Sequence, residues 1–572
     1  MKNREVVEIF NGIADLLEIM GENPFRIRAY RKAAQNIEAL SRDVAEVSEK
    51  EGELEQIPGI GKDLAQKIRE IISTGRLQYY EDIKKEVPSE LVDMLSVPGL
   101  GPKTAKLFYE RLNIKSIEEL EEMASSHRLA GLPGIKEKTE ENILRGIQML
   151  KRGKERQPLG RVLPVALDIL DRLKMCKEVE RISLAGSLRR MKDTIRDIDI
   201  LATSNHPERV MKVFVNLPQI REVLAHGQTK SSIVTHEGLQ VDLRVVEKDS
   251  YGAALAYFTG SKTHNIRVRE MAMKRGLKIN EYGIFREDTG KKIGGKEEED
   301  IFRVIGLPYI PPELREDTGE IEAAQNRRLP DLLELSDIKG DLHVHSKWSD
   351  GAHTFEELVA GAIKRGYQYL AITDHSKSLG IARGMTDEDI IKQKGEIYEI
   401  NKRLRGFRLL AGIEVNIRGD GSLDYTDDIL ARLDIVVAAI HSGFKQSKEQ
   451  LTSRIIKAIR NPHVDVIAHP TGRLLGERDA YEVDMGEILR EAKKHNTTLE
   501  INAYPLRLDL NDTYCKRAKE LGVPLIISTD AHIINQLDYM NSGVSVARRG
   551  WLEKGDILNT LPAERLMAWL KK

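Results

Sequence analysis

Seven short apolar runs alternate with helical stretches over the last part of the chain, from about residue 337 onward. The runs are DLHVH, YLAITDH, LLAGIEV, DIVVAAIH, VDVIAH, TLEINA and LIISTDAH. Alternating strands and helices predict parallel βα units, and about seven such units favour a barrel over an open sheet. The carboxyl ends of barrel strands open into one shared pocket. Side chains at these ends should therefore meet, although they are far apart in the sequence.

Acids and histidines gather at these strand ends. Of the 14 histidines in the chain, nine follow residue 340, and six of those nine stand at the ends of the runs. The His-X-His and Asp-X-His pairs place two side chains on one face of a strand, because side chains alternate. Nitrogen and oxygen donors without sulfur favour zinc, manganese or iron, and such a set could hold two or three ions. The candidate ligands are His343, His345, Asp350, His375, Glu414, His441, His469, Asp530 and His532.

The motifs DLHVHSKWSDG, TDH, GIE, IHSG, AHP and TDAH resemble those of the polymerase and histidinol phosphatase (PHP) family of metal-dependent phosphoesterases. The resemblance implies a distorted (β/α)7 barrel whose ions lower the pKa of a bound water and hold phosphate oxygens. Glu500 ends the remaining run and would either bind an ion or orient a ligand. The ligand sets implied are His343, His345, Glu414 and Asp530 for one ion, Glu414, His441 and His469 for a second, and Asp350, His375 and His532 for a third.

A second group of acids lies in the middle of the chain, in LAGSLRRMKDTIRDIDILAT and VDLRVV. Asp197 and Asp199 share one face of a strand, and Asp242 adds a third carboxylate from a later strand. Three carboxylates can hold two Mg²⁺ or Mn²⁺ ions, one activating a 3′-hydroxyl and one clamping a triphosphate. Gly186 and Ser187 precede a helical turn and offer backbone amides to phosphate.

This segment resembles the nucleotidyltransferase fold and, through YFTGSKTHNIRVREMAMKRGLKINEYGIF, the family X DNA polymerases typified by polymerase beta. The resemblance implies an α/β palm followed by a small α+β subdomain, with selection for deoxynucleotides because a tyrosine packs against the incoming sugar. The residues implied to contact dNTP or DNA are Tyr257, Phe258 and Gly260 in the sugar pocket, Asn265 at the incoming base, Arg269 on the template side, and Ser187, Arg190 and Arg161 at the triphosphate.

The N-terminal region contains two copies of hydrophobic-Pro-Gly-hydrophobic-Gly before a helix, at 57–68 and 97–108. Their glycines, Gly59, Gly61, Gly99 and Gly101, let backbone amides approach a phosphate, often with a bound monovalent cation. These are helix-hairpin-helix motifs, which bind DNA with few basic side chains. They answer the objection that a net charge of −1 is unusual for a nucleic-acid binder. A third copy, at 132–143, has Lys136 in place of the second glycine.

The stretch FRIRAYRKAAQNIEAL with the first hairpin resembles the small lyase domain of polymerase beta. This resemblance places Lys67 at that family's Schiff-base position, where it would attack the aldehyde of an abasic sugar. Asp63 stands where the family often has a basic residue, which would weaken 5′-phosphate binding. Lyase activity is therefore the less favoured of the expected activities.

The cysteine content, the absence of long apolar runs and the changes in sequence pattern bear on the compartment and on the domain boundaries. With only Cys176 and Cys515, neither a disulfide framework nor a thiolate zinc site is expected. No signal peptide or membrane-spanning run is present, so we expect a cytoplasmic, monomeric protein with no membrane partner. The expected domains are 1–80 (lyase-like), 81–155 (helix-hairpin-helix), 156–247 (palm), 248–315 (nascent-base-pair binding), 316–336 (linker) and 337–572 (PHP).

Together these motifs predict a repair polymerase that uses dNTPs to fill short gaps in nicked or gapped duplex DNA. The PHP domain is expected to act as a 3′-to-5′ exonuclease, an abasic endonuclease, a 3′-phosphatase or a mixture of these. Two alternatives stay open: a PHP domain that is only a scaffold, and a template-independent nucleotidyltransferase. The sequence does not decide which phosphoester is cut or which metals are used.

Overall fold

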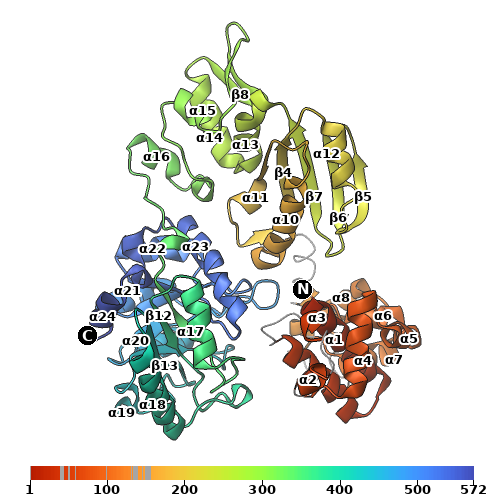
Figure 1. The fold of residues 1–572 in the computed structure, drawn as a ribbon, viewed down its shortest axis with the longest axis vertical. Helices are drawn as coiled ribbons and strands as arrows, with labels where there is room; N and C mark the ends of the chain where they lie inside the picture. Colours follow the sequence, from red (N-terminus) through yellow and green to blue (C-terminus); the bar gives the residue numbers. More distant parts are fainter. Residues whose placement is uncertain are drawn as a thin grey trace. The chain divides into compact units, whose positions relative to one another are not determined.

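The computed structural model of the chain describes residues 2–38, 44–48, 52–57, 59–97, 100–129, 132, 135, 139–144, 146–147 and 156–571. They form a helical N-terminal region, a polymerase beta-like central region with mixed sheets and a parallel seven-stranded sheet (Figure 1). The predicted fold class is thereby confirmed. Among the described residues, no helix combines the length and the apolar character needed to cross a bilayer.

The N-terminal region is built around one apolar core. Helix α1 (Lys2–Met20) buries Val6, Phe10, Ile13 and Leu17, whose spacing of three or four residues places them on one helical face. The other elements described in this region are α2 (Pro24–Glu38), α3 (Val44–Ser48), η1 (Leu54–Gln56), α4 (Lys62–Thr74), α5 (Gln78–Glu86), α6 (Ser89–Met94), α7 (Pro102–Leu112) and α8 (Ile117–Ser125).

The central sheet has the strand order β2-β4-β7-β6-β5. Only its β4–β7 pair is parallel, and this pairing places Asp199 directly beside Asp242. Helix α10 packs on β2 and β4, whereas α12 packs on β6 and β7 (Figure 1). The elements are β1 (Gln157–Pro158), α10 (Leu159–Lys174), β2 (Arg181–Leu184), α11 (Gly186–Arg189), β3 (Thr194–Ile195), β4 (Asp197–Thr203), α12 (Pro207–Phe214), β5 (Ile220–His226), β6 (Lys230–Thr235) and β7 (Gln240–Val246).

A small α+β subdomain follows, in which β9 lies between β8 and β10 in an antiparallel sheet. The segment expected to be a linker contains helix α16, and its Ile321 and Ala324 are buried in the core of this subdomain with Phe302. The elements are η2 (Lys248–Ser250), α13 (Tyr251–Thr259), α14 (Lys262–Met273), β8 (Leu277–Asn280), β9 (Gly283–Arg286), β10 (Lys292–Gly294), α15 (Glu299–Val304), η3 (Pro312–Leu314), α16 (Glu320–Gln325) and η4 (Leu335–Asp337).

A buried carboxylate joins the central sheet to this subdomain. Both oxygens of Glu298 accept hydrogen bonds from Arg189 at 2.7 Å, and Arg315 donates to one of them at 2.7 Å. Burial opposes ionisation of Glu298, but the two guanidinium groups more than offset it and lower the pKa to about 2. Glu298 therefore contributes to stability as an anion.

Replacing Glu298 by glutamine is expected to lower the free energy of unfolding of this region by about 3 to 5 kcal/mol, because two guanidinium groups lose their shared anion. The depressed pKa implies that the stabilisation is present above the ordinary value of 4.5 and is lost as the pH falls toward about 2. Calorimetry of the full chain should show the wild-type transition approaching that of Glu298→Gln in this acidic range.

The matched control is Glu297→Gln, because Glu297 pairs with Arg181 at 2.9 Å on the surface, where about half of its side chain is exposed. This substitution should change stability by less than about 1 kcal/mol. Equal transition temperatures for the two variants at neutral pH would contradict the role assigned to Glu298.

The seven strands of the last sheet are paired in sequence order, β11 to β17, and all are parallel. The first strand is also tied to the segment after the last, because Asp530 N donates to His343 O at 3.0 Å and His345 N to Ala531 O at 2.8 Å. These bonds leave the sheet a nearly closed barrel. The strands are β11 (Gly340–Val344), β12 (Tyr369–Ile372), β13 (Arg408–Asn416), β14 (Ile435–Ala439), β15 (Val466–Ile467), β16 (Thr498–Asn502) and β17 (Leu525–Ser528).

Alternate strand residues form one apolar cluster with the C-terminal helix. Ala371, Leu410 and Ala439 belong to this cluster. An even number of residues separates them from His375, Glu414 and His441, respectively, so each pair is in phase with the alternation of side chains along a strand. The apolar cluster thus packs the parts of the strands that precede the metal-ligand candidates. The helices are α17 (Phe355–Lys364), η5 (Gly380–Ala382), α18 (Asp387–Arg403), α19 (Asp427–Leu430), α20 (Lys448–Ile459), α21 (Met485–His495), α22 (Asp512–Leu521), η6 (Ile534–Tyr539), α23 (Met540–Arg549), η7 (Lys554–Asp556), η8 (Leu558–Thr560) and α24 (Ala563–Leu570).

Candidate active sites

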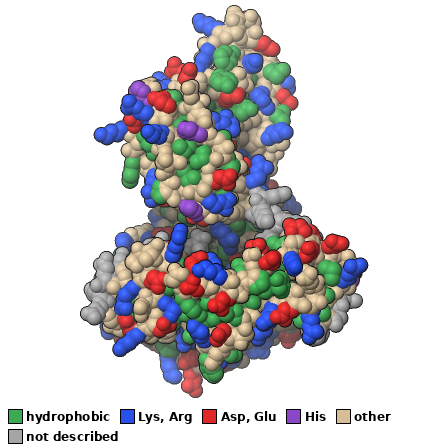
Figure 2. All heavy atoms as spheres, turned by 90° about the vertical axis from the view of Figure 1, so that its right-hand side faces the viewer, with side chains coloured by type: hydrophobic (Ala, Val, Ile, Leu, Met, Phe, Trp, Pro, Cys, Tyr) green, Lys and Arg blue, Asp and Glu red, His purple; other side chains and the backbone are tan. Residues whose placement is uncertain are grey.

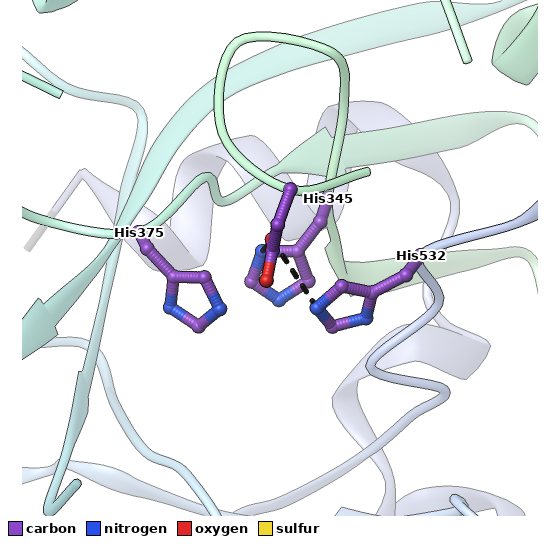
Figure 3. A group of neighbouring side chains, drawn as sticks. His345, His375 and His532 are labelled. Atoms are coloured by element: carbon purple, nitrogen blue, oxygen red, sulfur yellow. Dashed lines mark ion pairs between the residues drawn. The ribbon is translucent and has the colours of Figure 1, made fainter. Parts of the chain in front are cut away.

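The strand ends of the barrel bring histidines and acids together in overlapping groups. In one group, ligand atoms of His345, Asp350, His375 and His532 all lie within 4.8 Å of one another. Figure 3 shows the three imidazole rings converging from different segments of the barrel. Asp350 Oδ1 is 3.4 Å from His532 Nε2 and 4.0 Å from His345 Nδ1. This spacing suits four donors around one cation.

Glu414 is the most connected carboxylate of the barrel. One of its oxygens lies 3.1 Å from both His441 Nε2 and His469 Nε2, and the other lies 2.7 Å from His375 Nδ1. Burial opposes ionisation of Glu414, but the imidazoles of His441, His375 and His343 more than offset it and hold its pKa well below the usual value. A buried anion surrounded by nitrogen donors is a site for cations.

The three groups of neighbouring ligand atoms share more residues with one another than do the three ligand sets implied by the family resemblance. His345 lies both with Asp350, His375 and His532 and in a second group with His343 and Asp530. A third group joins His375 with Glu414 and His441. His469 falls outside these groups, although it approaches Glu414, and His343 Nε2 lies 3.6 Å from the same carboxylate. Eight of the nine candidate ligands thus lie in three groups that share members, and the ninth, His469, contacts Glu414 of one group.

The donor set fits several metal ions. It consists of imidazole nitrogens and carboxylate oxygens, the ligands that zinc, manganese and iron accept, and no thiolate. The Nδ1 atom of His469 is also buried, and within the described part of the chain no hydrogen-bond partner accompanies it. A buried polar nitrogen atom destabilises the folded protein unless a hydrogen-bond partner or another ligand binds it. The prediction of a cluster for more than one ion is confirmed, whereas the metals are not identified.

Two buried side chains hold the imidazoles in place. Glu500 accepts a hydrogen bond from His343 Nδ1 at 2.7 Å and another from the backbone of His469 at 2.8 Å. Of the two roles open to Glu500, the contacts are those of a residue that orients a ligand. Asn416 accepts from His441 Nδ1 in the same way. Sequence reasoning missed Asn416, although its position two residues after Glu414 on β13 places both on one strand face.

Asp341, the first residue of the DLHVH run, is fully buried. It accepts hydrogen bonds from Thr529 and is not a member of the three groups of possible metal ligands. It accepts from Thr529 Oγ1 at 2.5 Å and from the backbone N–H of Thr529 at 3.2 Å. Burial raises the pKa of Asp341 to about 6. Asp341 thereby fixes the segment that carries Asp530 and His532.

The three acids of the central sheet also meet at one place. Asp199 and Asp242 are neighbours on β4 and β7, and Asp197 precedes Asp199 on the same strand face. Burial, together with repulsion from Asp197 and Asp242, raises the pKa of Asp199 to about 6. Bound divalent cations would relieve this repulsion, so the acids fit a two-metal site.

Glycine is required beside these acids. Gly186 has a φ of +61°, and a Cβ atom there would lie 2.2 Å from an Asp199 carboxylate oxygen. The absent side chain lets the start of α11, with partly exposed Ser187, approach the acids. This backbone is thus available to a phosphate near the metal site.

The residues expected to contact the nucleotide are linked by hydrogen bonds. Arg190 donates to the carbonyl of Thr259 beside Gly260, and a Cβ atom on Gly260 would lie 3.1 Å from Arg190 Nη1. Asn265 Nδ2 donates to the Tyr257 carbonyl at 2.8 Å. The structure therefore joins Arg190 to the sugar-pocket turn.

Three other residues predicted to contact the nucleotide or the DNA make contacts within the protein. Arg269 Nε donates to the Asn265 carbonyl at 3.2 Å. Phe258 packs edge-on against Tyr257, with 5.2 Å between ring centres. Arg161 pairs with Glu477 of the barrel at 3.4 Å, with half of its side chain exposed.

The two hairpins place glycine at the start of a helix. Gly59 has a φ of +79°, Gly61 precedes α4, and Gly101 precedes α7. Among the described residues, no atom lies within 4 Å of a Cβ atom built on Gly61 or Gly101, so these residues leave the helix starts open to a ligand. Gly99 and Lys136 lie outside the described residues.

Lys67 lies on α4 and is paired with Asp63 one turn earlier. Its ammonium also lies 5.4 Å from the ring centre of Tyr79, and its side chain is 16% exposed. A lysine must lose its proton before it attacks an aldehyde. An attack by Lys67 would also have to break its pairing with Asp63, and the lyase function of Lys67 stays a prediction.

Surface charge does not form a single-sign field on the face drawn in Figure 2. Basic and acidic side chains of the described residues are interspersed there. This agrees with the balance of 89 Lys and Arg against 90 Asp and Glu. Contacts from backbone amides and bound cations can bind phosphates without such a field.

Comparison with known families divides the chain in the same order as its motifs. Residues 1–77 match a helix-hairpin-helix domain, and residues 91–149 match a SAM-like helix-hairpin-helix tandem. Residues 254–316 match the DNA polymerase beta thumb, and residues 341–504 match the PHP domain. The PHP match ends before Asp530 and His532, which the structure nevertheless places with the other ligand candidates.

Individual relatives cover the whole chain or one part of it. The DNA polymerase/3′-5′ exonuclease PolX of Bacillus subtilis is 41% identical over 100% of both chains. A probable phosphatase of Thermoanaerobacter sp. is 31% identical over 38% of this chain and 89% of its own length. DNA polymerase lambda of Rattus norvegicus is 26% identical over 55% of this chain and 56% of its own. The chain therefore belongs to the family X DNA polymerases that combine helix-hairpin-helix motifs, a polymerase beta-like region and a C-terminal PHP domain.

Proposed function

We propose that the chain is a DNA-directed DNA polymerase that fills short gaps and also removes nucleotides from 3′ ends with its PHP domain. The observation that carries this proposal is the presence of two separate acidic centres, one of three carboxylates and one rich in histidine. The full-length relative, named as a polymerase and 3′-5′ exonuclease, supports the same pair of activities.

In the polymerase site, Asp197, Asp199 and Asp242 would hold Mg²⁺ or Mn²⁺, which would supply activation of the primer hydroxyl and neutralise the triphosphate. The backbone at Gly186 and Ser187 binds the phosphates together with the guanidinium of Arg190. Tyr257 packs against the sugar. The amide of Asn265 faces the incoming base, and Arg269 faces the template.

In the PHP site, the nine ligands would hold two or three zinc, manganese or iron ions, and such ions would supply a nucleophile from water near neutral pH and neutralise the phosphate. The chain fixes the ligands: Glu500 accepts a hydrogen bond from Nδ1 of His343, so that Nε2 of His343 would face the ions. Arg507 Nε lies 3.7 Å from Asp530 and places a positive charge beside the reacting phosphate.

The helix-hairpin-helix motifs hold duplex DNA by its phosphates through the helix starts at Gly61 and Gly101, with the help of a monovalent cation. Gapped or nicked duplex DNA and dNTPs are the proposed substrates. The enzyme is proposed to act in the cytoplasm as a monomer. Deoxynucleotide addition and 3′ hydrolysis on one chain suit the repair of short gaps.

The test is nucleotide incorporation on a gapped duplex with each of the four templating bases, with Mg²⁺ or Mn²⁺. We expect the complementary dNTP to be preferred by at least about a hundredfold, because a mismatched pair costs several kcal/mol in the transition state. Incorporation that ignores the templating base would replace this proposal with the template-independent transferase. Parallel substrates ending in 3′-hydroxyl, 3′-phosphate or containing an abasic site identify the ester that is cut.

A further inference from the structure

The last residue of α23, Arg549, reaches from the barrel to the polymerase region. Its Nη1 donates to the backbone carbonyl of Arg190 at 2.7 Å and to Glu316 at 3.0 Å, and its Nη2 donates to Asp512 at 2.6 Å. Its side chain is only 5% exposed. One guanidinium therefore connects an acid of the barrel, Asp512, with the residue that follows α11.

Glu316 closes this network. The oxygen that accepts from Arg549 also accepts from Arg190 Nε at 3.0 Å. Burial disfavours the Glu316 anion, but Arg190 and Arg549 more than offset this and lower its pKa. Both the backbone carbonyl and the side chain of Arg190 are thus held, one directly by Arg549 and the other through Glu316.

The held side chain lies where a nucleotide would bind. Arg190 donates to the carbonyl of Thr259 in the sugar-pocket turn, and its charge acts on the carboxylate of Asp199. Its guanidinium therefore contacts the sugar-pocket turn and is close enough to Asp199 to act on the charge of that carboxylate. An arginine in this place can bind the triphosphate only while its backbone and its side-chain direction are fixed.

A second arginine of the barrel holds the same loop. Arg473 Nη1 donates to Asp193, three residues after Arg190, at 3.1 Å, and Arg473 Nε donates to the carbonyl of Arg507. Close packing accompanies this contact, because a Cβ atom on Gly160 would lie 1.9 Å from Pro505 Cβ. The loop from Arg190 to Asp193 is thus fixed by the barrel at both of its ends.

We propose that Arg549, a residue of the PHP barrel, is a positioning residue for the polymerase reaction, which holds Arg190 in the geometry that binds the dNTP triphosphate. This inference rests on the proposed function, in which Arg190 contacts the triphosphate. Nucleotide affinity then depends on a side chain that belongs to the hydrolytic domain. Arginine is needed because a planar guanidinium reaches three acceptors, which a single ammonium cannot span.

The test is steady-state gap filling by full-length Arg549→Met, with Arg548→Met as the matched control. Arg548 is the preceding residue of α23 and joins the barrel to the polymerase region through Glu313 and the Leu333 carbonyl, at 2.7 and 3.0 Å. We expect KM for dNTP to rise about tenfold in Arg549→Met, with kcat changed less than about twofold, because a buried charged hydrogen bond is lost. Arg548→Met should leave KM unchanged.

Exonuclease activity of each variant, measured on single-stranded DNA, reports whether the barrel is folded. If Arg549→Met is unfolded, Arg549→Lys decides, because lysine keeps the charge beside Asp512 and Glu316 but cannot also reach the Arg190 carbonyl. A KM several times that of wild type supports the proposal. A wild-type KM in the folded variant, or an equal rise in Arg548→Met, overturns it.

Failure of the underlying function gives a different result. If wild type adds no nucleotide, or Arg190→Ala leaves the KM for dNTP unchanged, the role assigned to Arg190 fails, and this inference fails with it. If Arg190→Ala raises KM and Arg549→Met does not, only the role of Arg549 is lost.

Discussion

Replacing Asp242 by asparagine is expected to reduce nucleotide incorporation on gapped DNA by on the order of a thousandfold, because a two-metal site supplies several kcal/mol of transition-state stabilisation. Asp242 lies beside Asp199 on the paired strands β7 and β4, so its loss removes one of the three carboxylates of the proposed metal site. Hydrolysis by the PHP domain should stay within about twofold of wild type, because its ligands come from other strands.

The measurement is single-turnover extension of a labelled primer, with 3′ degradation followed on the same DNA without dNTPs. Asp288→Asn provides the control, because Asp288 is an exposed acid in the turn between β9 and β10. Incorporation by Asp242→Asn at more than about a tenth of the wild-type rate would remove the carboxylate triad from the mechanism.

Glu414→Gln should have the opposite effect. Hydrolysis is expected to fall by on the order of a thousandfold, and the metal content of the purified protein should fall with it, because the carboxylate that faces four imidazoles loses its charge. Incorporation on gapped DNA should be unchanged. Elemental analysis and nuclease assays on the same preparations connect the two losses.

His375→Ala tests the same centre with a smaller disturbance of the buried carboxylate and should also lose hydrolysis. The matched control is His495→Ala, because His495 lies at the end of α21, partly exposed and 3.5 Å from Glu491. Full metal content with unchanged nuclease activity in Glu414→Gln would favour a PHP domain that is a scaffold.

The sequence predicts much of the fold because its signals are periodic and local. Each strand of a βα unit can be recognised from its own short apolar run. Ligands at the strand ends share one pocket, whatever their separation in the chain. The acids of the central sheet follow from strand alternation and the pairing of β4 with β7. Helix-hairpin-helix turns are recognisable because glycine is placed where the backbone requires it, as at Gly59.

Other features depend on contacts that no local pattern records. His345 belongs to two groups of ligands, because Asp350, which follows it in a loop, lies 4.0 Å from its Nδ1 while His343 and Asp530 also lie close to it. The contact of Arg549 with Arg190 joins residues 359 positions apart. Such contacts depend on how the barrel packs against the polymerase region, which single motifs do not encode.

The hydrogen bonds between β11 and the segment after β17 have a consequence for synthesis of the chain. His343 and His345 emerge from the ribosome early, but their partners Asp530 and His532 follow almost two hundred residues later. All three carboxylates of the polymerase centre have been translated before the first barrel strand begins. A fragment that ends between Asp242 and Asp530 therefore contains the polymerase carboxylates without a complete hydrolytic centre. Loss of the segment from Asp530 onward would remove the hydrolytic centre together with Arg549, so the shortened chain would keep its polymerase carboxylates but lack both the means to remove its own additions and the side chain that holds Arg190.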